Sequence, residues 1–184
     1  MSKVCYVFLA EGFEEIEALT VVDILRRENI ATETVSITKD KTVVGSHSIP
    51  VIADKVIDEV KLSDAALLVL PGGMPGTLNL MECKKLMDMV IEFNSTNRRL
   101  AAICAAPRIF GELSLLEGKK AVCYPGNEDK LKGAIVLMED VVTDGNITTS
   151  RGMGTAIPFA IELVKLFKSE TEALAIKSKI IYKG

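Results

Sequence analysis

A run of six apolar residues without a polar break, Ala65 to Leu70, limits the fold of this chain more than any other segment. Such a run is typical of a strand buried on both faces, as in the centre of a parallel sheet. A loop rich in proline and glycine, Pro71 to Gly76, follows at once and must leave the strand. The segment therefore predicts an α/β fold, with a mostly parallel sheet covered on both faces by helices.

Strand-like and helix-like segments alternate along the rest of the chain, as such a sheet requires. We expect further strands at Val4 to Ala10, Ala31 to Thr38 and Arg99 to Ile103, an irregular hairpin or edge at Thr42 to Val51, and a hairpin at Val141 to Ser150. Helices are expected at Glu15 to Glu28, at Cys83 to Phe93, from Pro107 onward and at Ala156 to Phe167, and Glu172 to Ile181 is interpreted as a helix with a short strand.

Composition argues against several classes of protein. The length of 184 residues fits one domain, residues 1–184, and a net charge of −3 without a Lys or Arg block argues against nucleic-acid binding. No apolar run approaches the roughly 20 residues that span a bilayer, and no secretory signal precedes the first strand. Four scattered cysteines and a single histidine argue against a structural zinc site. We therefore expect a cytoplasmic protein with free thiols and no bound metal.

The candidate nucleophile is Cys104. An apolar strand runs into this residue, Ala102 and Ala106 flank it at two positions on either side, and Pro107 begins a helix. Small residues at these spacings allow the sharp strand-to-helix turn of a nucleophile elbow. A helix N-terminus at this point is expected to lower the pKa of the thiol. The alternative is an ordinary buried cysteine at the end of a strand.

Two further features complete the candidate site. Gly72 and Gly73 allow the backbone to approach a ligand, and their N–H groups, with that of Ala105, are candidates for an oxyanion hole. Glu17 heads the apolar stripe of the first helix, so burial is expected to keep its carboxyl group protonated beside Cys104. The alternatives are a simple tight turn for the glycine pair and a helix-dipole contact for Glu17.

The remaining candidates are interpreted as structural. Cys5, Cys83 and Cys123 lack an elbow around them, and burial statistics favour inert thiols. The only histidine, His47, lies in the irregular hairpin segment, and the sequence gives no reason to place it beside Cys104. A hydrolytic cysteine–histidine pair, as in a cysteine peptidase, is therefore unsupported.

Four motifs occur in an order that resembles a known family. They are Ala10-Glu-Gly-Phe-Glu-Glu-Ile-Glu17, Leu70-Pro-Gly-Gly73, Ala101-Ala-Ile-Cys-Ala-Ala-Pro107 and Thr149-Ser-Arg-Gly152. Over nearly its whole length the chain resembles the ThiJ/PfpI superfamily, in the branch of the Parkinson disease protein (DJ-one) and bacterial YajL. The resemblance implies a flavodoxin-like sandwich that forms a homodimer. It also implies a reactive Cys104, a protonated Glu17 and backbone donors at Gly73 and Ala105, with Gly72 shaping the loop.

The sequence departs from the family at several positions. Tyr124 stands where the family often has a histidine, and Ala105 stands where the peptidase-like branch has one. Ala106 replaces a glycine after the elbow, and Met153 replaces a pocket proline. Both missing histidines argue against a triad-type peptidase and leave Glu17 with most of the acid–base work.

Two functions remain open at this point. The resemblance implies a glyoxalase or protein deglycase without a cofactor, in which Cys104 attacks a small 2-oxoaldehyde or its protein adduct to form a hemithioacetal. The alternative is a non-enzymatic sensor of oxidative stress, or a redox-regulated chaperone, that uses the same cysteine as an oxidation target.

Overall fold

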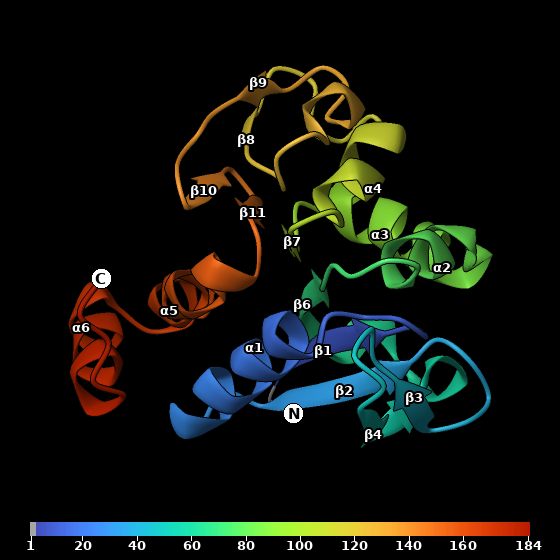
Figure 1. Ribbon diagram of the computed structural model, residues 1–184, viewed down its shortest axis with the longest axis horizontal. Coiled ribbons are helices and arrows are strands. Elements are labelled where there is room, and N and C mark those ends of the chain that lie inside the picture. The colour runs from blue at the N-terminus through green and yellow to red at the C-terminus, as the bar shows by residue number, and fades with distance from the viewer. Residues whose placement is uncertain (1–2) are drawn as a thin grey trace.

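A computed structural model describes residues 3–184, and at its centre is a seven-stranded sheet (Figure 1). The strand order is β10-β11-β7-β6-β1-β2-β5, and every neighbouring pair is parallel except β10 with β11. The strands are β1 (Val4–Leu9), β2 (Thr32–Ser36), β5 (Lys55–Val56), β6 (Ala65–Leu70), β7 (Arg99–Ile103), β10 (Val141–Asp144) and β11 (Ile147–Ser150). The predicted mostly parallel sheet is confirmed, including the bounds of β6 and β7.

Helices cover both faces of this sheet, which makes the fold a flavodoxin-like sandwich (Figure 1). One face carries α1 (Glu15–Arg27), α5 (Ala156–Phe167) and α6 (Glu170–Lys179), and the other carries α2 (Gly76–Glu82), α3 (Lys84–Ser95) and α4 (Pro107–Glu112). Successive strand residues point to opposite faces. Val7 therefore packs in the core beneath α1 and α5, whereas Phe8 packs in the core beneath α3 and α4. Because both cores are apolar, the strands contain few polar residues.

Shorter elements lie outside the main sheet. The predicted hairpin at Thr42 to Val51 is confirmed as the antiparallel pair β3 (Thr42–Val44) and β4 (Pro50–Ile52). A second small sheet pairs β8 (Lys120–Ala121) with β9 (Ile135–Val136) in parallel. Strands of two residues carry no periodicity, so no sequence pattern predicts them. Residues 3–184 also contain four 3₁₀ turns: η1 (Ile57–Glu59), η2 (Leu62–Asp64), η3 (Glu128–Lys130) and η4 (Met153–Thr155).

The predicted short strand near Ile181 is wrong. Helix α6 occupies the last segment and begins at Glu170, where the Ser169 hydroxyl accepts a hydrogen bond from the Glu172 N–H. After the helix the chain folds back, because Ile181 adopts a φ of +59° and the Tyr182 N–H donates to the Lys177 carbonyl. This turn caps the helix and leaves no extended segment to join the sheet.

The loops that leave the carboxyl ends of β1, β6, β7 and β11 are tied to one another, as expected from the sheet topology. The Gly76 N–H donates to the Gly12 carbonyl at 3.1 Å, and the Glu14 N–H donates to the Gly72 carbonyl at 2.9 Å. These bonds join the loops after β1 and β6 into one rim above the sheet. Within residues 3–184, no helix is long and apolar enough to cross a membrane.

Candidate functional site

Cys104 occupies a strained turn between β7 and α4. Its φ is +66°, a conformation that costs a non-glycine residue of order 1–3 kcal/mol and persists only when its surroundings enforce it. Two backbone hydrogen bonds do so: the Cys104 N–H donates to the Ser150 carbonyl at 3.0 Å, and the Tyr124 N–H donates to the Cys104 carbonyl at 2.8 Å. The predicted elbow is therefore present, and it holds the half-buried thiol at the carboxyl edge of the sheet.

The carboxyl group of Glu17 meets this thiol from the first turn of α1. Glu17 is 1% exposed, and its side chain forms a hydrogen bond with Cys104. The Gly72 N–H donates to Glu17 Oε2 at 2.8 Å. A Cβ atom at position 72 would lie 2.6 Å from Glu17 Oε2 and 2.6 Å from Cys104 Cβ. Residue 72 must therefore be glycine for the carboxyl group and the thiol to meet.

Burial dominates the titration of this pair. It raises the pKa of Glu17 to about 7, so the expectation of a carboxyl group that holds its proton far above the usual range is supported. Burial and the adjacent Glu17 carboxylate raise the pKa of the Cys104 thiol to about 12. Two acids in direct contact titrate as a unit, so the pair loses its first proton near neutral pH and its second only in strong alkali. At pH 7 about half of the molecules therefore hold the pair in the form that shares one proton and one negative charge.

The expectation that the helix N-terminus lowers the thiol pKa is wrong. Helix α4 has only six residues and begins three positions after Cys104, so its dipole is weak at the sulfur. The groups that do favour the sulfur anion are the backbone N–H groups of Ala105 and Gly73, which hydrogen-bond to Cys104. The structure thus brings together Cys104 and Glu17 with Gly72, Gly73 and Ala105, and two donors of the expected oxyanion hole face the sulfur.

A cavity of about 530 Å³ opens above the thiol. Cys104, Glu17, Gly73 and Ala105 all line it, whereas Gly72 lies behind the wall. The other lining residues are Glu14, His47, Met74, Tyr124, Asn127 and Met153. Clefts of this size accept small organic ligands and side chains of proteins.

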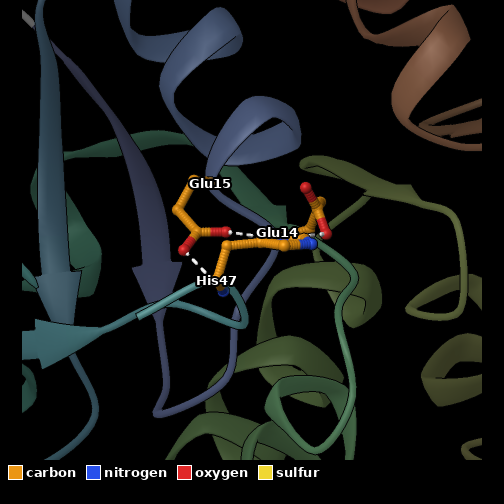
Figure 2. Close-up of side chains that lie close together, drawn as sticks. All are labelled: Glu14, Glu15 and His47. Atoms are coloured by element: carbon orange, nitrogen blue, oxygen red, sulfur yellow. Dashed lines mark hydrogen bonds and ion pairs between the residues drawn. The ribbon is translucent and has the colours of Figure 1, made fainter. Parts of the chain in front are cut away.

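His47 is one of the lining residues that the sequence did not predict, along with Glu14, Met74 and Asn127. His47 lies in the loop between β3 and β4, which folds over the start of α1 (Figure 2). Its N–H donates to Glu15 Oε1 at 2.9 Å, and its Nδ1 lies 3.1 Å from Glu15 Oε2. These hydrogen bonds help lower the pKa of the buried Glu15 carboxyl to about 2, although burial alone would raise it, and the pKa of His47 is raised in return. No local pattern in the sequence reveals this contact between residues 32 positions apart.

The same corner holds the donor atoms that a metal ion would need. One ligand atom from each of Glu14, Glu15 and His47 lies within 4.8 Å of the others (Figure 2). In the part of the chain that the structure describes, this is the only such group of three. Its atoms already pair with one another, since His47 Nδ1 lies near both carboxylates and the Ser46 hydroxyl bonds to them as well.

The other three cysteines lie away from this chemistry. Cys5 is fully buried and Cys123 is 4% exposed, and burial raises the pKa of these thiols to about 12 and about 11. Cys83 caps the start of α3 and does not line the cavity. Among the four cysteines, the cavity contains only Cys104.

A family model, two related sequences and a solved structure that match this chain are all of DJ-1 proteins or the DJ-1/PfpI family. A model of the DJ-1/PfpI family matches residues 3–166. The chain is 37% identical over 94% of its length to the Arabidopsis thaliana protein DJ-1 homolog B, but it spans only 40% of that protein. It is 33% identical to the Drosophila melanogaster protein dj-1beta, over 98% of this chain and 94% of that protein. The solved structure of oxidized Toxoplasma gondii DJ-1 superposes with a TM-score of 0.94 at 30% identity, and each chain is fully covered. Because the chain spans about two-fifths of the plant relative, that protein's full activity does not transfer to it.

Replacing Gly72 with alanine should disrupt the contact between Glu17 and Cys104. The new methyl group must displace one of the two side chains, so we expect a loss of about 1–3 kcal/mol in unfolding free energy and slower alkylation of Cys104. Urea denaturation and iodoacetamide kinetics measure both effects. Gly154→Ala is the matched control, because nothing lies within 4 Å of a Cβ at that position. Equal stability of the two variants would contradict the close packing.

The raised pKa of Glu17 also predicts how stability depends on pH. Between its ordinary value of 4.5 and about 7, the folded protein keeps a proton that the unfolded chain has lost, so unfolding free energy falls as pH rises. We expect the wild type to lose about 3 kcal/mol across this range that Glu17→Gln does not lose. Urea denaturation of both proteins at pH 4.5 and 8 measures the difference. Parallel pH profiles would show that Glu17 is not held protonated.

Proposed function

The chain belongs to the DJ-1/PfpI family, and from that premise we propose that it is a cysteine-dependent glyoxalase or protein deglycase. Its substrates would be 2-oxoaldehydes or their adducts with protein side chains. The observation that carries this proposal is the buried Glu17 carboxyl group beside the Cys104 thiol, both in the wall of an open cavity. A nucleophile and a proton carrier in direct contact are what addition to an aldehyde and movement of its C–H proton require.

The first step forms a hemithioacetal. The sulfur of Cys104 attacks the aldehyde carbon, the C=O electron pair moves to oxygen, and the proton shared with Glu17 passes to that oxygen. The N–H groups of Gly73 and Ala105 donate hydrogen bonds to the sulfur while its charge changes. Glu17 is left as a carboxylate. Its position beside the sulfur then places it near the carbon that has just become bonded.

The second step moves a proton between adjacent carbons. The Glu17 carboxylate takes the proton from the hemithioacetal carbon and returns it to the neighbouring carbonyl carbon, while the hydroxyl proton passes from the first oxygen to the second. The product is a thioester of a 2-hydroxy acid. A pKa of about 7 suits this work, because a base near the working pH both accepts and returns protons readily. Water then cleaves the thioester, so methylglyoxal plus water gives lactate and regenerates the thiol. This reaction consumes no electrons and needs no cofactor.

A second candidate function is that of a sensor of oxidative stress or a redox-regulated chaperone. It is favoured by the placement of the sulfur, since Cys104 is the one cysteine that lines the cavity. Oxygen atoms added to this sulfur would meet the same N–H donors, and the solved structure of Toxoplasma gondii DJ-1 is that of an oxidized protein. The oxidation proceeds from the thiolate through sulfenate to sulfinate.

We further propose a cytoplasmic homodimer. The four free cysteines fit a reducing compartment. A groove of about 640 Å³ between α1, α5 and the β3–β4 loop supports the dimer, because its walls include the apolar side chains of Ile16, Ile49, Ile157 and Ile180. Ile16 and Ile49 are 48% and 50% exposed, and a second copy of the chain would cover them.

Lactate formation from methylglyoxal tests the enzymatic proposal. We expect Cys104→Ser to reduce the rate to background and Glu17→Gln to reduce it about 10²- to 10⁴-fold. Cys83→Ser is the matched control, because that thiol lies outside the cavity. An enzymatic or chromatographic lactate assay gives the rates. Equal low rates in the wild type and Cys104→Ser would reject the activity.

Mild peroxide treatment tests the sensor proposal. Mass spectrometry of tryptic peptides should find sulfinate on Cys104 first, with Cys5 and Cys123 protected by burial. Glu17→Gln should slow this oxidation, because the variant can no longer share a proton with the sulfur. Even oxidation over the four cysteines would count against a sensor role.

A further inference from the structure

The proposed reaction leaves its last step without a base. Glu17 exchanges protons with the sulfur and the substrate carbons, and it is 1% exposed behind them. Hydrolysis of the thioester needs a group on the open side of the cavity, where water enters. We propose that His47 is the general base that activates this water and that Glu15 is its positioning residue. The inference rests on the proposed function, because it concerns the same cavity.

The first support is that His47 is held in a fixed orientation by its neighbours. The buried Glu15 carboxylate binds it twice, through the backbone N–H at 2.9 Å and through Nδ1 at 3.1 Å (Figure 2). The Ser46 hydroxyl also lies 3.0 Å from Nδ1. A carboxylate on one ring nitrogen fixes the tautomer and the ring orientation, as in the histidines of hydrolytic triads.

The second support is the nitrogen that remains. With Nδ1 engaged, Nε2 is free to accept a proton, and it has no hydrogen-bond partner among residues 3–184. The His47 side chain is 66% exposed and lines the cavity together with Tyr124 and Asn127. Water therefore has access to this nitrogen in the same cavity as Cys104.

The third support is the charge around the ring. Two carboxylates face His47, Glu15 at 3.1 Å and Glu14 at 3.7 Å, and Arg and Lys are absent from the residues lining the cavity. The negative charges stabilise the imidazolium that forms when the ring takes a proton. The raised pKa of His47 agrees with this surrounding.

In the proposed step, water cleaves the thioester bond to Cys104. A water oxygen attacks the thioester carbonyl carbon while His47 Nε2 takes one of its protons. The carbon–sulfur bond then breaks, and its electron pair stays on the sulfur of Cys104, where the Gly73 and Ala105 N–H groups receive the charge. The imidazolium returns its proton to the sulfur and Glu17 pair through water. The product is the free 2-hydroxy acid.

Steady-state and trapping kinetics with His47→Gln test the assignment. Glutamine keeps a polar side chain but cannot take a proton, so turnover should fall about 10²-fold or more. Formation of the adduct should remain fast, and the lactoyl thioester on Cys104 should accumulate. Hydroxylamine converts that thioester to a hydroxamate that can be counted per chain. Wild-type turnover in His47→Gln, or low turnover without trapped thioester, would overturn the proposal.

The role of Glu15 is tested by the pH profile of turnover. In Glu15→Gln, the part of the pH profile that reflects ionisation of His47 should move to lower pH, because the imidazolium loses a buried negative partner. Glu28→Gln is the matched control, since Glu28 is a buried carboxylate at the other end of α1 that pairs with Lys179. If both variants lose stability but neither changes the pH profile of turnover, the contact between Glu15 and His47 only stabilises the packing of the β3–β4 hairpin on α1.

A spectroscopic measurement separates this inference from the proposed function. The chain has one histidine, so the imidazole ¹⁵N signals report His47 alone. Alkylation of Cys104 should shift the Nε2 signal in the wild type and in Cys83→Ser, but not in Cys104→Ser. If the shift is present but no lactate forms, the glyoxalase proposal is rejected, whereas the position of His47 in the Cys104 cavity is confirmed. Absence of the shift would overturn the placement of His47 in the Cys104 cavity, whatever the activity.

Discussion

The hydrogen bond between the Glu17 carboxyl group and the Cys104 thiol is the interaction on which the rest of the site depends. Two acids that touch in a buried place cannot both ionise near neutral pH, because the second charge would face the first in a poorly solvated environment. One proton and one negative charge are therefore confined between a carboxyl group and a sulfur. The proposed chemistry uses this proton, first on the substrate oxygen and then on the substrate carbons.

The fold enforces this contact from three directions. Strand β7 and the strained elbow present the thiol, the first turn of α1 presents the carboxyl group, and the loop after β6 passes between them at Gly72. Hydrogen bonds join the start of α1 to the loop after β6, and separate hydrogen bonds to Ser150 and Tyr124 hold the elbow. The free energy stored in the positive φ of Cys104 is offset by these bonds and by the two apolar cores below.

Sequence alone predicted the parts of this arrangement that local chemistry determines. The apolar run of β6, the small residues around Cys104 and the glycine pair each have a short-range cause, so the sheet, the elbow and the loop were confirmed. The predicted downward shift of the thiol pKa was wrong. The helix N-terminus suggested a lower pKa, but the pKa is raised by burial and by a carboxylate 87 positions away. His47 was missed for the same reason: the β3–β4 loop reaches the cavity only in the folded chain. The strand expected near Ile181 was wrong because a helix cap competes with extension there.

The rate of Cys104 alkylation as a function of pH tests the shared proton most directly. Iodoacetamide reacts with the thiolate, so its kinetics between pH 5 and 10, measured on the wild type and Glu17→Gln, report how the negative charge on the sulfur changes as the pair ionises. A shared proton gives a midpoint near pH 7 in the wild type, and a clearly higher midpoint in the variant, where a buried thiol must ionise alone. The same midpoint in both proteins would show that sulfur and carboxyl group titrate independently and that no proton is shared.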